Sequence, residues 1–120
     1  MATVSVEESA VAVRLSLGDE ILALHGSLHI PFSHIRSVST DPVSETWYRG
    51  MKFGTNLPGV KTAGTFITGD GMIFYDFHDP SRCLTFNLSH ERYQQVVVEV
   101  DHDQDPKALA AAVRQRLTPA

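Results

Sequence analysis

The sequence lacks most of the features that would identify a chemical function. Its 120 residues include one cysteine, so no disulfide can form within the chain and no multi-cysteine zinc site exists. No apolar run is long enough to span a bilayer, and the N-terminus lacks the charged and apolar regions of a secretion signal. We therefore expect a soluble, cytoplasmic protein that folds without a disulfide or a metal.

Basic residues are also scarce. Ten lysines and arginines against fourteen acids give a net charge of −4. Binding to nucleic acids or to anionic membranes depends on clustered cations, so we expect no nucleic-acid partner and no membrane association. What remains is an ordinary globular composition, 42% hydrophobic and 20% charged, at the length of one domain. We expect a single domain over residues 1–120.

Alternating apolar and polar residues predict a chain rich in strands. The segments 3–7 and 11–17 alternate on either side of Glu8 and Ser9, which predicts a hairpin. The short apolar run 21–24 fits either a helical turn or a strand, and both alternatives stay open. Further strands are predicted at 35–39, 72–78, 83–88 and 95–100.

The most clearly defined element is a helix near the C-terminus. Asp105 followed by Pro106 is a favourable start, because Asp caps a helix and Pro fits its first position. Apolar residues three, four and eight positions after Leu109 form one stripe along such a helix. We expect an amphipathic helix over about 105–117 that follows the strands, which is an α+β order.

The predicted strand 72–78 is apolar on both faces. Such a strand has one face covered by the core and the other by a helix or another subunit, and the pattern does not show which face is which. Aromatic residues and methionine near residues 47–53 are also typical of interfaces. We therefore expect the chain to form a homo-oligomer or to bind a protein partner. The candidate interface residues are Trp47, Tyr48, Phe53, Ile73, Tyr75 and Phe77.

Glycines and a proline gather between residues 50 and 64, which predicts an irregular loop followed by a strand from about residue 60. Cations occur around this loop without acids, so exposed backbone amides and basic side chains suggest an anion site. The alternative is a loop that covers the rim of the fold and contacts a neighbouring subunit. The candidate residues of the anion-binding loop 49–64 are Arg49, Lys52, Gly54, Gly59 and Lys61.

Three stretches resemble small bacterial pleckstrin-homology-like (PH-like) proteins: Ile30–Val38, Gly54–Phe66 and Leu84–Asp105. The central stretch, Gly-Thr-Asn-Leu-Pro-Gly-Val-Lys-Thr-Ala-Gly-Thr-Phe, is the most specific, and the match covers most of the chain from about Leu15. The resemblance implies a split antiparallel β-barrel of about seven strands, capped by a C-terminal α-helix. It implies an unassigned function, frequent assembly into oligomers, and no catalytic residues.

The histidines and the lone cysteine form no recognisable catalytic or metal-binding pattern. His78 lies near Asp76 and Asp79, but the spacing is not that of a zinc site. Cys83 has no partner histidine in a motif, so we expect it to behave as a small buried hydrophobe. We predict a non-enzymatic, oligomerising interaction module without a metal or cofactor. The alternative is a domain that binds small anions or phosphoinositide headgroups through the loop 49–64.

Overall fold

The computed structural model describes residues 2–15, 28–40, 51–57, 61–68 and 71–117. These residues form nine strands, two short 3-10 helices and one α-helix, so the predicted α+β class is confirmed. The strands are Ala2–Val6 (β1), Ala10–Leu15 (β2), Leu28–Pro31 (β3), Ile35–Ser39 (β4), Met51–Leu57 (β5), Lys61–Thr68 (β6), Gly71–Phe77 (β7), Cys83–Leu88 (β8) and Gln95–Glu99 (β9). The helices are Phe32–His34 (η1), Pro80–Arg82 (η3) and Pro106–Leu117 (α2).

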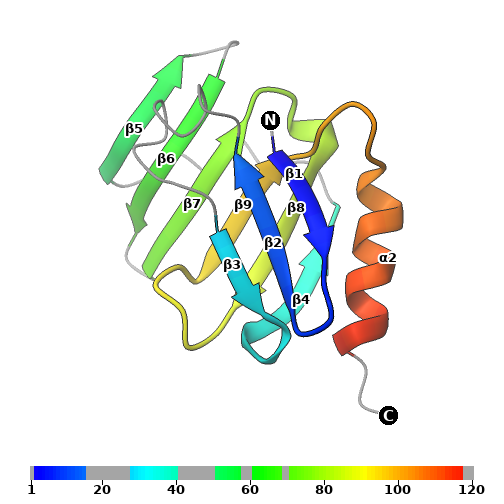
Figure 1. The fold of residues 1–120 in the computed structure, drawn as a ribbon. Coiled ribbons are helices and arrows are strands. Elements are labelled where there is room, and N and C mark those ends of the chain that lie inside the picture. The colour runs from blue at the N-terminus through cyan, green and yellow to red at the C-terminus, as the bar shows by residue number, and fades with distance from the viewer. Residues whose placement is uncertain (1, 16–27, 41–50, 58–60, 69–70, 118–120) are drawn as a thin grey trace.

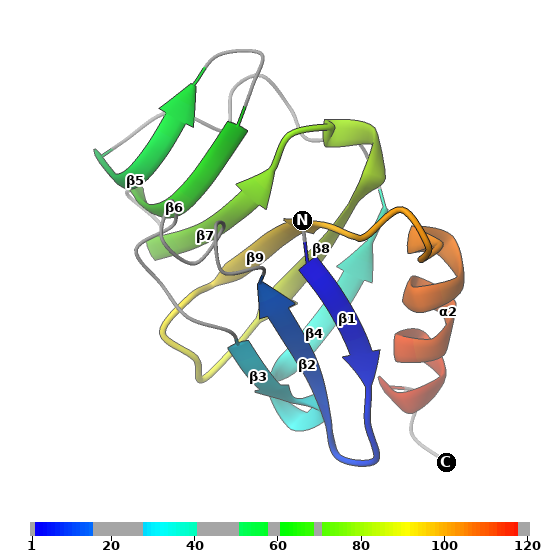
Figure 2. The same ribbon diagram turned by 45° about the horizontal axis from the view of Figure 1, so that its top comes forward.

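The strands form two sheets, which Figures 1 and 2 show from two angles. One sheet has three strands in the order β1-β2-β3, and the other has six in the order β4-β8-β9-β7-β6-β5. In Figure 1 the three-stranded sheet lies in front of part of the larger sheet, and β5 and β6 extend beyond it at the upper left. The larger sheet therefore has a part covered by the second sheet and a part that projects from it.

Most of the predicted strands are confirmed. β1 and β2 pair as the expected hairpin, with Val4 opposite Val13. The strands predicted at 35–39, 72–78, 83–88 and 95–100 appear as β4, β7, β8 and β9. The segment 21–24, for which two alternatives were open, lies outside the described residues.

The predicted split antiparallel barrel is confirmed only at the level of its class. The described residues contain nine strands instead of about seven, and the two sheets they form do not close into a barrel. β7 and β9 also pair in parallel, whereas the other pairs are antiparallel. The parallel pair arises because the chain passes from β7 to β8 and then returns through β9, which lies between them. This connection links strands that are distant in sequence, and local alternation gives no sign of it.

The two sheets are joined at one corner through β1. Ala2 forms an isolated parallel bridge with Val100, and the amide of Asp101 donates to the carbonyl oxygen of Ala2 at 2.9 Å. The side chain of Gln104 pairs with the backbone of Val4, accepting from its N–H at 3.0 Å and donating to its oxygen at 2.8 Å. These bonds attach the first strand to the segment that leads into α2.

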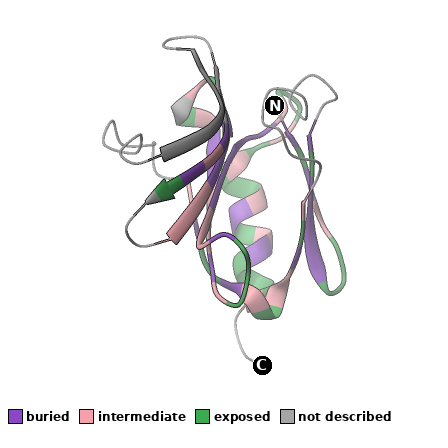
Figure 3. Ribbon diagram, turned by 90° about the vertical axis from the view of Figure 1, so that its left-hand side faces the viewer, coloured by how far each residue is buried: buried purple, intermediate pink, exposed green. Residues whose placement is uncertain are grey.

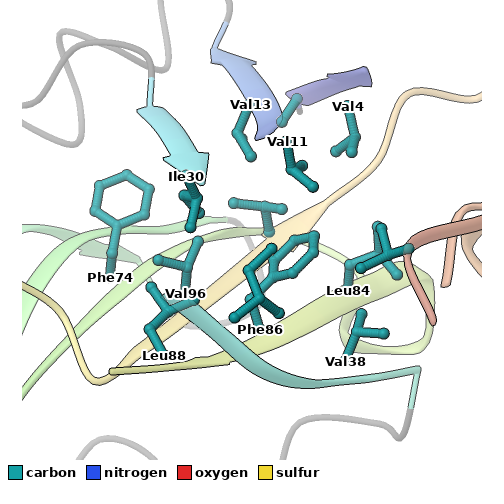
Figure 4. Close-up of a cluster of buried hydrophobic side chains, with 14 of the residues drawn as sticks. Val4, Val11, Val13, Ile30, Val38, Phe74, Leu84, Phe86, Leu88 and Val96 are labelled. Carbon is teal, nitrogen blue, oxygen red and sulfur yellow. The ribbon is translucent and has the colours of Figure 1, made fainter. Parts of the chain in front are cut away.

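Apolar side chains fill the space between the two sheets, as Figure 4 shows. The three-stranded sheet contributes valines and Ile30, which point toward aromatic and aliphatic side chains of the larger sheet. Burying one side chain of this size contributes about 1.5–3 kcal/mol, so this layer is the main source of stability. The cluster includes Val4, Val11, Val13, Ile30, Val38, Phe74, Leu84, Phe86, Leu88 and Val96.

The helix α2 begins where the sequence predicts. The carboxylate of Asp105 accepts from the amide of Lys107 at 3.0 Å, which is the expected N-terminal cap. Val113 is fully buried in the core, and the guanidinium of Arg114 donates to the carbonyl oxygen of Val38 in β4 at 2.9 Å. Figure 3 shows the two sheets as separate layers, and Figures 1 and 2 place α2 at one side of them, where it contacts β4 and β1. The helix thus contributes to the core and also lies along β4.

Candidate functional site

The six-stranded sheet has an inner face, which packs against β1, β2 and β3, and an outer face on the opposite side. Strand register assigns side chains to these faces, because successive residues of a strand alternate. Phe74 lies on the inner face, and its neighbour Tyr75 lies on the outer face in a cross-strand row with Val97 and Thr85. The predicted site residues within the described chain belong to β5, β6 and β7, so these strands are the candidate site.

The predicted glycine-rich loop is largely strand, which corrects the sequence interpretation. β5 and β6 pair in antiparallel register, with Met51 opposite Ile67 at one end and Leu57 opposite Lys61 at the other. Gly54 lies directly opposite Gly64, and Gly64 has a φ of 138°, in the region that favours glycine. Glycine usually weakens a strand, which is why a cluster of glycines indicated a loop. Here the glycines belong to a hairpin.

The anion-binding candidates do not come together in one place. Lys52 lies opposite Phe66, whereas Lys61 lies opposite Leu57 at the other end of the hairpin. Positions 52 and 57 of β5 are five residues apart, or about 17 Å at roughly 3.4 Å per residue. Two further candidates, Arg49 and Gly59, lie outside the described residues. A single small anion would therefore not reach both lysine positions.

The interface candidates Tyr75 and Phe77 are buried within the chain, at 3% and 5% exposure. They form a second cluster on the outer face with Phe66, Cys83 and Val97, and the half-buried Ile73 packs against it. The two-sided character of strand 72–78 is thus confirmed, but Tyr75 and Phe77 are not exposed contact residues. The sequence could not distinguish coverage by the chain itself from coverage by a partner.

The rings of this second cluster meet edge to face. The centroids of Phe66 and Tyr75 lie 4.8 Å apart at an interplanar angle of 82°, and those of Tyr75 and Phe77 lie 5.8 Å apart. Burial raises the pKa of Tyr75 to about 12. Of the other interface candidates, Phe53 belongs to β5, and Trp47 and Tyr48 lie outside the described residues.

A buried carboxylate that sequence reasoning missed organises the turn after β7. Glu99 is 3% exposed, and its Oε1 accepts from the amides of His78 at 2.7 Å and Asp79 at 3.0 Å. Asp79 in turn accepts from the hydroxyl and the amide of Ser81, and these hydrogen bonds lower the pKa of Asp79. The available signal was the single charge inside the apolar run Val-Val-Val-Glu-Val. The side chain of Glu99 thus links β9 to the turn at His78 and Asp79 through two hydrogen bonds.

Cys83 is fully buried, as predicted, and its thiol donates to the carbonyl oxygen of Asp79 at 3.5 Å. An inaccessible thiol held in this way cannot attack a substrate. The Nδ1 of His34 contacts the Oε2 of Glu91, and the Nε2 of His29 lies 3.6 Å from the Oε1 of Glu7. Within the part of the chain that the structure describes, no three His, Cys, Asp or Glu side chains are placed to hold a metal ion.

No protein-family model, curated protein or solved structure matches this chain. The resemblance to PH-like proteins therefore stays a prediction from the sequence. None of the helices in the described residues has the length and apolar character needed to cross a membrane.

Proposed function

We propose that this chain is a non-enzymatic interaction module that forms a homodimer through the outer edge of β5. The observation that supports this proposal is a difference between the two edges of the six-stranded sheet. β5 pairs with β6 on one side, and no other described strand pairs with its outer side. The unpaired N–H and C=O groups of an edge strand readily bond to a second strand.

The opposite edge of the sheet, at β4, is closed by α2. The helix packs along β4, and Arg114 donates a hydrogen bond to the backbone oxygen of Val38. Because one edge is covered, the sheet can be extended in one direction only. Two copies that pair through β5 would use the same surface on each, and the assembly would close at two copies instead of growing into a fibre.

The sequence of β5 is compatible with pairing to a second copy of itself. Antiparallel pairing centred on Gly54 would set Lys52 opposite Asn56 of the second copy and Met51 opposite Leu57. No like charges would then face each other, and like charges in direct opposition destabilise a sheet. Lys52 and Gly54, first considered for anion binding, and Phe53, first considered for an interface, would all lie at this dimer edge.

The proposal includes a PH-like fold. Support comes from the three resembling stretches and from a C-terminal helix that packs against β4 of one sheet and β1 of the other, whereas the parallel pair of β7 and β9 departs from that pattern. The non-enzymatic part is supported by the engagement of Cys83 and Glu99 in buried structural contacts. Anion or phosphoinositide binding through loop 49–64 has less support, because the two described lysine positions are far apart along the hairpin.

Two charge variants at one position test the dimer. Asn56→Lys would face Lys52 of the second copy in two symmetry-related pairs, whereas Asn56→Glu would form two opposite-charge pairs there. At about 0.2–1 kcal/mol per pair, we expect Asn56→Lys to weaken dimerisation by about two- to thirtyfold. Asn56→Glu should leave dimerisation unchanged or strengthen it. Sedimentation velocity over a range of concentrations measures both.

Asn56→Lys and Asn56→Glu are controls for each other, because each adds one charge at the same position and only the sign of that charge differs. Circular dichroism and thermal unfolding of the two variants should agree, which separates dimer loss from misfolding. Equal dissociation constants for Asn56→Lys and Asn56→Glu, with a dimeric parent, would mean that the dimer uses a different surface.

A further inference from the structure

A polar pocket lies away from the proposed dimer edge, where β4 and β9 begin and β8 ends. Its volume is about 720 Å³, within the range of small-molecule sites. The lining is mostly polar and includes one cation and three carboxamides. The lining residues are Arg36, Ser37, Asn87, Leu88, Gln94 and Gln95.

A β-bulge places the cation in this pocket. Ile35 pairs with Leu88 and Ser37 pairs with Asn87, so Arg36 is an extra residue without a partner in the register. In a regular strand Arg36 and Ser37 would point to opposite faces, but the extra residue lets both be exposed on the outer face while Ile35 is buried. Arg36 is the only charged lining residue, and it has no hydrogen bond or ion pair with another described residue.

A row of hydrogen-bonded side chains forms one wall across β4, β8 and β9. The Nδ2 of Asn87 donates to the hydroxyl oxygen of Ser37 at 2.9 Å, and the Nε2 of Gln95 donates to the Oδ1 of Asn87 at 2.9 Å. These bonds hold the three side chains in fixed positions. They also leave the Ser37 hydroxyl proton, the Gln95 Oε1 and one N–H on each amide to bind a ligand.

Gln94 is positioned by its own backbone and by a glycine. The backbone N–H of Gln94 donates to the carbonyl oxygen of Met72, and the backbone carbonyl oxygen of Gln94 accepts from the N–H of Leu88, both at 2.8 Å. Its side chain lies over Gly71, where a Cβ atom would come within 3.2 Å of the Gln94 Oε1. Gly71 also has a φ of 138°, so a glycine at this position leaves room for the third carboxamide.

We propose that this pocket binds a small monoanionic organic acid that carries hydroxyl groups. The planar guanidinium of Arg36 can bind a carboxylate through two parallel hydrogen bonds. The carboxamides and the Ser37 hydroxyl offer both donors and acceptors, which match ligand hydroxyl groups. A single cation suits one negative charge better than a phosphate group, which proteins usually hold with several cations or a nest of backbone amides.

The experiment is an NMR titration of the full-length, nitrogen-15-labelled chain with D-glucuronate. The side-chain amide signals of Asn87, Gln94 and Gln95 should shift and saturate. D-glucose and D-glucuronamide, which lack the carboxylate, should not shift them. Arg36→Gln should weaken binding about tenfold or more, because it removes hydrogen bonds to a charged group. Arg14→Gln removes the same charge from an exposed position of β2 and should leave binding unchanged.

Arg36→Lys is a second variant that keeps the charge but loses the paired geometry, so its affinity should fall between those of the parent and Arg36→Gln. The same spectra show whether each variant is folded. Lack of saturable shifts with D-glucuronate, or equal binding by the parent and Arg36→Gln, would overturn the proposal. Equal shifts with inorganic phosphate would mean a general anion site and would overturn the carboxylate assignment. None of these outcomes depends on whether the chain dimerises.

Discussion

The two faces of the six-stranded sheet bury their aromatic side chains in different ways. On the inner face, Phe74 and Phe86 belong to a cluster that includes residues of the second sheet and of α2. On the outer face, the clustered residues Phe66, Tyr75 and Phe77 have their described ring partners within the same sheet. Both clusters are buried, but the inner one contains more buried side chains. Removal of a side chain should therefore cost more on the inner face.

The outer face itself has two parts. Aromatic side chains lie over β6 and β7, and the hydrogen-bonded row of Ser37, Asn87 and Gln95 lies over β4, β8 and β9. This partly exposed polar row contributes little to stability, since a net hydrogen bond adds only about 0.5–1.5 kcal/mol. The comparison teaches that one sheet face can combine a stabilising half with a half suited to binding.

The largest expected effect is at Phe86 on the inner face, which is fully buried. Phe86→Ala should reduce the free energy of unfolding by about 3–5 kcal/mol, because the two packed layers cannot collapse to fill the cavity. Phe77→Ala on the outer face removes the same atoms and should cost about 3 kcal/mol, the low end of this range, because Phe77 is 5% exposed and belongs to the smaller cluster. Urea unfolding of both variants measures the difference. Equal losses would show that both faces are enclosed to the same degree.

A smaller effect is expected at Glu99, the buried carboxylate near the outer cluster. Glu99→Ala would leave the amides of His78 and Asp79 without their acceptor and should cost about 1–3 kcal/mol. Glu99→Gln keeps an acceptor oxygen and should cost less in the same urea unfolding experiment. If the two substitutions were equally destabilising, the negative charge and not its hydrogen bonds would stabilise the turn.

The third effect concerns Tyr75 and appears only at high pH. Burial raises the pKa of Tyr75 from 10.0 to about 12, so the unfolded chain loses this proton at a lower pH than the folded chain does. The stabilisation is therefore complete below pH 10 and is lost as the pH rises toward 12. Tyr75→Phe should remove this part of the pH dependence. Chemical unfolding at several pH values tests this prediction. If the free energy of unfolding of Tyr75→Phe fell with pH as steeply as that of the parent, other groups would cause the loss of stability.

Local sequence patterns predicted much of the fold. Alternation located β1, β2 and β8, and the Asp-Pro start located α2, because these signals depend on neighbours in the chain. The pairing of β7 with β9 could not be predicted this way, since it depends on β9 inserting between β7 and β8, which is a contact between segments distant in the sequence. The glycines of β5 and β6 indicated a loop because glycine usually weakens a strand, and the sequence does not show that Gly54 and Gly64 lie opposite each other in a pair of strands.

The candidate site was predicted less well, for two physical reasons. The two apolar faces of β7 were visible, but whether the chain itself covers Tyr75 depends on contacts that alternation does not encode. The pocket was missed because a β-bulge changes which residues share a face. Its signal was present in the spacing of Ile35 and Val38, which are both buried although three positions apart in one strand. A regular strand would bury positions separated by two.

The most direct test of the proposed function is native mass spectrometry of the unmodified chain from gentle buffer over a range of concentrations. We predict a species with the mass of two chains and no further assembly, because the outer side of β5 pairs with no other described strand and α2 covers the opposite edge. The mass of one chain at every concentration would contradict dimerisation through β5.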